Sequence, residues 1–198
     1  GEQPSQAGPV FFGAIVCFLF ILGLVIIRSP HKWWILAASI IGIVLAWGKN
    51  LPSVNYFLFD HVPMLNKFRT VEMALVIPQF LFPLLGIWAV QEVIDKKIDS
   101  AQLWKGVKIA AGITAGICIL LGIGGSIFFD YSGWRDAQFQ PEMVKLLKED
   151  RASLTMMSSL KSAVYIILAA ALLWAYIKDK IKPVMLVGGL GLLLVIDL

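Results

Sequence analysis

The chain has 198 residues, of which 59% are hydrophobic and 15% are charged, and its mean hydropathy is +0.81. Soluble domains contain about 45–50% apolar and about 25% charged residues. A soluble domain of this composition would expose large apolar patches, so the composition excludes that class and predicts an integral membrane protein. The net charge of +4 comes with no run of like charges and no basic stripe with interleaved aromatics, which excludes nucleic acid as a partner.

Six apolar runs predict an all-α fold, a polytopic transmembrane bundle of about six spans. A spanning helix needs about 20 mostly apolar residues to cross a hydrocarbon core about 30 Å thick. The second run is short, and Pro78 and Pro83 should kink the third helix because proline removes a backbone donor. The spans are expected near 9–27, 33–47, 71–90, 107–129, 160–177 and 184–198.

The distribution of basic residues predicts that the N-terminus lies outside the membrane. Cytoplasmic loops of membrane proteins carry an excess of Lys and Arg. The short segments 28–32, 92–108 and 178–182, in which basic residues outnumber acidic ones, would then lie inside. The outer segments are longer and mix acidic with basic residues. Tryptophans at the ends of the runs support these limits, since an indole there can bury its ring and keep its N–H in water.

Two outer segments, 51–69 and 130–158, are expected to lie along the membrane interface. The first alternates bulky apolar residues with polar ones, so it is too polar to span and too apolar for a free linker. The second contains an amphipathic helix over 141–153, which Pro141 and Glu142 suit as a first turn. Within the fourth run, Gly112 and Gly116 form a GxxxG pattern that favours close helix packing.

The chain offers no set of ligands for a metal ion. Cys17 and Cys118 both lie inside apolar runs, away from any histidine at ligand spacing. The two histidines, His31 and His61, are expected on opposite sides of the membrane, which argues against a zinc site. No nucleotide-binding or hydrolase motif is present, and no cofactor is implied.

The start of the third run carries the best candidate for a binding site. Arg69 and Glu72 are three residues apart on one helix face, and Asn66 and Lys67 precede them. One interpretation is an anion site at the outer interface, in which Lys67 and Arg69 hold a phosphate. The other is structural, with both basic side chains reaching lipid headgroups and Glu72 pairing with Arg69. Gln79 extends the same polar stripe inward.

Further along the chain, carboxylates lie beside aromatic residues. Asp130 and Asp136 flank Tyr131 and Trp134, a combination that suits either sugar binding or a membrane rim. Asp150 and Arg151 follow as adjacent charges, and we interpret them as a solvated pair on an interfacial helix.

Several of these segments resemble the YfhO-like family of bacterial membrane proteins. The resemblance rests on residues 46–50 (AWGKN) and 63–71 (PMLNKFRTV), then on 149–153 (EDRAS), 160–162 (LKS) and 195–198 (VIDL), in that order. It spans most of the chain, and the Asn-Lys-Phe-Arg element with the preceding Trp-Gly-Lys-Asn is its most specific part.

The resemblance implies a part of a glycosyltransferase similar to the GT-C class. Such enzymes transfer a sugar from a polyprenyl-phosphate carrier on the outer face of the membrane, here to a cell-envelope glycan at the bacterial inner membrane. The family's catalytic carboxylate would precede Gly1, so we expect this chain to be an internal segment of a longer protein. Lys67 and Arg69, with Asn66 and Glu72, would bind the lipid phosphate.

A second functional class remains open. The chain could be a non-catalytic scaffold, a subunit that binds other membrane proteins, or part of a transporter. Discontinuous helices line many transporter sites, and the proline-bearing third run with Glu72 and Gln79 would suit one. Under either interpretation the surrounding partners are membrane lipids.

Overall fold

The computed structural model describes residues 11–47, 71–128, 130–132 and 136–197, and all regular structure within them is helical. The all-α prediction is therefore confirmed for this part of the chain. In order, the elements are α1 (Ala14–Ile26), α2 (His31–Ala46), the 3-10 helix η3 (Val71–Leu75), α4 (Val76–Ile94), α5 (Ser100–Phe128), the 3-10 helix η4 (Asp136–Gln138), α6 (Pro141–Ile177) and α7 (Pro183–Asp197).

Three stretches among the described residues are long and apolar enough to cross a membrane, namely Met73–Ile94, Ser100–Gly125 and Pro141–Ile177. The other three helices, α1, α2 and α7, are equally apolar in character but shorter. Large apolar side chains such as Phe80, Ile87 and Ile123 point outward and are about two-thirds exposed. A surface of this kind suits hydrocarbon rather than water, as expected of a membrane-embedded bundle.

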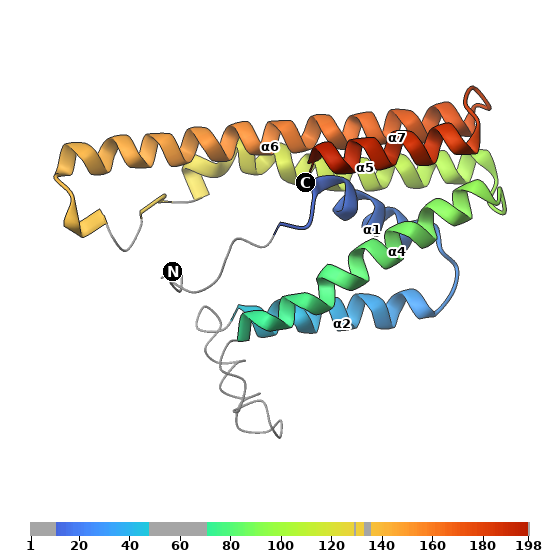
Figure 1. Ribbon diagram of the computed structural model, residues 1–198, viewed down its shortest axis with the longest axis horizontal. Helices are drawn as coiled ribbons and strands as arrows, with labels where there is room; N and C mark the ends of the chain where they lie inside the picture. Colours follow the sequence, from blue (N-terminus) through green and yellow to red (C-terminus); the bar gives the residue numbers. More distant parts are fainter. Residues whose placement is uncertain (1–10, 48–70, 129, 133–135, 198) are drawn as a thin grey trace, which may run out of the picture.

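The helices run back and forth between two ends of the molecule (Figure 1). The connections after α1, α4 and α6 lie together at one end, which we call the basic end and define as residues 27–32, 92–108 and 178–182. The start of α1, the end of α2, the start of η3 and the start of α6 lie toward the other side, which we call the opposite end. At the basic end the connections are short, which forces α1 and α2, α4 and α5, and α6 and α7 to run antiparallel.

Helix α1 forms the centre of the core. Its side chains at Ile15, Phe18 and Leu22 are fully buried at helical spacing, so they occupy one face. Helices α4, α5, α6 and α7 all pack against α1. Each contributes its own buried side chains at spacings of three or four residues, including Leu85, Val107, Leu173 and Leu186.

Glycines allow α1 and α4 to approach closely at two reciprocal positions. A Cβ added to Gly23 would lie 2.9 Å from the carbonyl oxygen of Leu85, and one added to Gly86 would lie 3.1 Å from Cβ of Leu19. Side chains larger than hydrogen would push the two helices apart. By contrast, no atom lies within 4 Å of a Cβ added at Gly112 or Gly116. The GxxxG pattern therefore packs no neighbouring helix within the described residues.

The prolines of α4 are accommodated without a break. Pro78 is the third residue of α4, where a helix has no intrahelical partner for the N–H, and Pro83 lies inside a helix that continues to Ile94. The 3-10 helix η3 ends where α4 begins. Pro78 also packs against α2, since a Cβ added at Gly42 would come within 2.8 Å of its ring.

Helix α6 is longer than the sequence pattern indicates. The amphipathic stretch 141–153 and the apolar run 160–177 are one continuous helix of 37 residues, about 55 Å long. The residues that join them, 154–159 (LTMMSS), contain no proline or glycine to stop the helix. Because a hydrocarbon core is about 30 Å thick, α6 extends well beyond what a single crossing requires. Its first half reaches past the other helices in Figure 1.

At the basic end, α4 and α6 terminate in the same way. The second residue after each helix has left-handed backbone geometry, with φ of 49° at Lys96 and 56° at Asp179. The Asp179 N–H donates to the carbonyl of Tyr176, which satisfies one of the free carbonyls at that helix end. Lys96 and Asp179 form an ion pair with each other, so the two helix ends are joined.

Candidate functional site

The predicted phosphate site falls largely outside the described residues. Asn66, Lys67 and Arg69 lie outside them, and so does the interfacial segment 51–69. Glu72 belongs to η3, but its side chain is likewise outside the described part. Gln79 is exposed on α4. The geometry of this site therefore stays a prediction.

The described residues on either side of this stretch lie close together. Helix α2 packs against η3, which places Trp47 and Val71 at the opposite end of the bundle.

A second charged group at the opposite end is built around Arg151 of α6. Its guanidinium makes two parallel hydrogen bonds of 2.8 Å to the two carboxylate oxygens of Asp136, and it also donates to the carbonyl of Tyr131 at 2.8 Å. The Asp136 side chain is only 8% exposed. This forked arrangement ties the connection between α5 and α6 to the flank of α6.

The interpretation of Asp150 and Arg151 as a solvated pair is therefore wrong for Arg151. Its partner is Asp136, 15 residues earlier in the chain, rather than the adjacent Asp150. Sequence spacing could not reveal this contact, because it depends on the path of the connection before α6. The same contact assigns Asp136 a structural role.

Asp130 has a comparable but exposed partner. The ammonium of Lys148 lies 2.9 Å from its carboxylate, and the Ser132 hydroxyl donates to the other oxygen at 2.9 Å. The hydrogen bond from Lys148, followed by that from Ser132, holds the pKa of Asp130 below its ordinary value. Asp130 is thus ionised and paired at neutral pH.

The basic end carries a strong excess of positive charge. Its acidic residues are Glu92, Asp95, Asp99 and Asp179. Its basic residues are Arg28, Lys32, Lys96, Lys97, Lys105, Lys108, Lys178, Lys180 and Lys182. Among the described residues, only Lys96 and Lys97 of this set form ion pairs, with Asp179 and Asp95. Lys32 donates to the carbonyl of Leu24 at 2.7 Å and Arg28 to the Gln102 side chain at 3.1 Å, both neutral partners. The positive charges of these seven other basic residues therefore have no carboxylate partner in the described part of the chain.

Aromatic rings accompany these basic side chains. The ammonium of Lys180 lies 4.6 Å from the ring centre of Trp174, and that of Lys32 lies 5.3 Å from Trp33. Lys108 and Trp104 form a looser pair at 6.0 Å. Tryptophan and lysine together are typical of the headgroup level of a bilayer, where a ring is half-buried and a cation meets phosphate.

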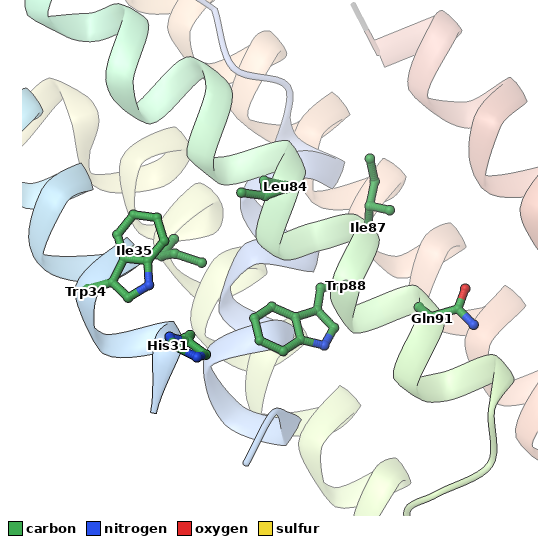
Figure 2. A pocket seen from close by; sticks show the side chains of 7 residues that line it. All are labelled: His31, Trp34, Ile35, Leu84, Ile87, Trp88 and Gln91. Carbon is green, nitrogen blue, oxygen red and sulfur yellow. The ribbon is translucent and has the colours of Figure 1, made fainter. Parts of the chain in front are cut away.

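A groove of about 510 Å³ opens between α2 and α4 at this end (Figure 2). The two helices pack closely where Gly42 meets Pro78, and the groove lies further toward the basic end. The Trp88 ring is directed across it toward His31. The lining residues are His31, Trp34 and Ile35 from α2 and Leu84, Ile87, Trp88 and Gln91 from α4.

The polar atoms at the rim of the groove are organised by hydrogen bonds within α4. The indole N–H of Trp88 donates to Glu92 at 3.3 Å, and the Gln91 amide donates to Asp95 at 2.6 Å. Lys97 lies 2.8 Å from the same Asp95 carboxylate. The hydrogen bond from Lys97 is the main cause that holds the pKa of Asp95 below the ordinary range. This carboxylate is therefore ionised, and the charge of Lys97 compensates its own.

Sequence reasoning did not identify this groove, because its two walls are about 50 residues apart in the chain. The tryptophans at the run ends were its only sequence signal. Among the described residues, no three His, Cys, Asp or Glu side chains gather closely enough to hold a metal ion.

The chain matches no protein-family model, no curated protein and no solved structure.

Proposed function

We propose that this chain is part of a membrane glycosyltransferase-like protein that uses a polyprenyl-phosphate-linked sugar to modify a cell-envelope glycan. The proposal includes six membrane spans, an outer N-terminus and a location in the bacterial inner membrane. Lys67 and Arg69 would bind the phosphate of the donor, with Asn66 and Glu72 beside them.

The observation that carries the proposal is the separation of charge between the two ends. Unpaired basic side chains with tryptophans gather where α1, α4 and α6 end, as expected at a cytoplasmic surface. The opposite end, where α2 ends and η3 begins, would then face outward. Transfer from a polyprenyl-phosphate carrier takes place on that side in the enzymes the sequence resembles.

Six spans require the three short helices to cross as well. Helix α1 has 13 residues and α2 has 16, which correspond to about 20–24 Å. A bilayer can thin locally around short helices at modest cost. Figure 1 supports this count, because the shorter helices alternate in direction as the longer ones do. Helix α1 connects to α2 at the basic end, and α6 connects to α7 there.

A non-catalytic scaffold or subunit is the second candidate, and one observation favours it. The described carboxylates next to the aromatic residues at the opposite end, Asp130 and Asp136, are bound by Lys148 and Arg151. They are therefore held in structural contacts that a catalytic base would have to give up. The transporter version is less favoured, since α4 runs unbroken through Pro83.

Binding of a polyprenyl-phosphate sugar to the full-length protein in detergent tests the proposal. We expect the double variant Lys67→Ala, Arg69→Ala to lose binding, because a phosphate would then face no forked donor and no cation. The matched control is Lys145→Ala, Lys161→Ala, which removes two exposed positive charges from α6. Equal binding by wild type and the Lys67, Arg69 variant, with both folded by circular dichroism, would favour the scaffold.

A further inference from the structure

The groove between α2 and α4 has the chemistry of a hydrocarbon site that opens toward lipid. Its walls are mainly indole and aliphatic side chains, and Trp34, Leu84 and Ile87 are 53%, 40% and 70% exposed. In a membrane-embedded bundle, such open apolar surface contacts acyl chains. Its volume of about 510 Å³ is comparable with that of ordinary small-molecule sites.

Positive charge lies where the groove meets the basic end. Helix α2 begins here with His31 and Lys32 and has no acidic residue in its first turn. The Lys32 ammonium donates to the carbonyl of Leu24 at 2.7 Å, and it keeps its charge because this partner is neutral. The positive end of the helix dipole adds to these side chains. Arg28 precedes them and donates to the neutral Gln102 side chain at 3.1 Å, so its cation has no carboxylate partner in the described part of the chain.

The acidic residues near the rim lie on the other side of the groove. Glu92 lies in the last turn of α4, where it accepts the indole N–H of Trp88 and keeps its negative charge. Asp95 caps the same helix and is neutralised by Lys97. The rim is therefore asymmetric, with cations that have no carboxylate partner in the described part of the chain on the α2 side and the Glu92 carboxylate on the α4 side.

We propose that this groove binds an anionic phospholipid of the surrounding bilayer. One acyl chain lies along Trp34, Leu84 and Ile87, and the phosphate faces Arg28, His31 and Lys32. The apolar lining selects a hydrocarbon chain, and the unpaired cations select a negative headgroup. This site requires only that the bundle is embedded in a membrane, so it does not depend on the sugar-donor site at the opposite end.

Native mass spectrometry of the full chain with phosphatidylglycerol or phosphatidylcholine tests the apolar half of the site. We expect wild type to retain one phosphatidylglycerol molecule under activation that strips phosphatidylcholine. Leu84→Trp should fill the groove and abolish this retention. Leu192→Trp makes the same change at an exposed position of α7, outside the groove, and should leave retention intact. If Leu84→Trp does not fold, Ile87→Trp at the more exposed position replaces it.

The charged half is tested by Arg28→Gln with Lys32→Gln. A basic side chain near an anionic surface contributes roughly a fivefold preference, so we expect the double variant to lose roughly twentyfold in selectivity for phosphatidylglycerol. The control variant Lys145→Gln with Lys161→Gln removes two exposed positive charges of α6 outside the groove, and it should keep the selectivity for phosphatidylglycerol.

Three results would overturn the proposal. These are equal retention of both lipids by wild type, retention of phosphatidylglycerol by the groove variants, and loss of it in Leu192→Trp to the same extent as in Leu84→Trp. Each would show that the retained lipid is not held by this groove.

Discussion

Arg151 fixes the path of the chain between α5 and α6. Three hydrogen bonds of 2.8 Å join its guanidinium to Asp136 and to the carbonyl of Tyr131. The Asp136 carboxylate is nearly buried, and the forked contact with Arg151 compensates its charge there. Lys148 and Asp130 add a second, exposed link between the same segment and α6.

We expect Arg151→Gln to loosen this connection. The variant removes the forked donor pair that joins Asp136 and the Tyr131 carbonyl to α6, so chymotrypsin should cleave after Tyr131 or Phe139 several times faster than in wild type. The cleavage rate of Arg151→Lys should fall between those of wild type and Arg151→Gln, because an ammonium retains the charge without the forked geometry. The measurement is limited proteolysis in detergent, followed by mass spectrometry of the fragments.

Lys145→Gln serves as the control, since Lys145 is an exposed residue of the same helix. Unchanged cleavage in Arg151→Gln would contradict the role assigned to the pair.

Among the helices, α1 and α4 make a sterically demanding contact. The reciprocal pairs of Gly23 with Leu85 and Gly86 with Leu19 place the two backbones close to each other. In lipid no hydrophobic driving force brings helices together, so close packing of this kind supplies much of the association. Helices α5, α6 and α7 also pack on α1, so a shift of α1 would disturb their packing as well.

Gly23→Ala should therefore destabilise the bundle. The added Cβ would lie 2.9 Å from a backbone oxygen of Leu85, which cannot move without shifting α4. Overpacking of this kind costs about 1–3 kcal/mol, which should appear as a lower midpoint of thermal unfolding in detergent.

Gly112→Ala is the matched control, because no atom lies within 4 Å of the added Cβ. It should be neutral or slightly stabilising through its better helix propensity. A larger loss of stability in Gly112→Ala than in Gly23→Ala would contradict this account of the packing.

The helices themselves were largely predictable from the sequence, and their partners were not. The apolar runs located the helices because lipid requires long apolar segments. The GxxxG pattern at Gly112 did not identify the packed glycines, since a small residue packs only where a neighbouring helix crosses it. The sequence pattern did not indicate that α6 is one helix. The polarity of the chain changes between its amphipathic first part and its apolar second part, but the residues between them still favour a helix.

The candidate sites were predicted only in part, for a related reason. Arg151 was recognised as charged, but its pairing with Asp136 depends on the fold of a connection. The groove combines α2 with the second half of α4, and their juxtaposition follows from the crossing at Gly42. Lys67, Arg69 and Asn66 lie outside the described residues, so their role as a phosphate site remains a prediction.

At the scale of the whole molecule, the bundle has two chemically different ends. The basic end combines Lys and Arg side chains that lack a carboxylate partner in the described part of the chain with tryptophans, and the opposite end holds the ion pairs of Asp130 with Lys148 and Asp136 with Arg151. In a bilayer this asymmetry would orient the protein, with the basic end in the cytoplasm. The proposed sugar-donor site and the proposed phospholipid groove would both take their sidedness from that orientation.

Cysteine labelling tests this orientation most directly. In a background with Cys17→Ala and Cys118→Ala, Ser132→Cys marks the opposite end and Ser100→Cys marks the basic end, both at exposed positions. A membrane-impermeant maleimide applied to right-side-out vesicles should label Ser132→Cys at once and Ser100→Cys only after permeabilisation. Labelling of both before permeabilisation, or of Ser100→Cys alone, would contradict a membrane bundle with its basic end inside.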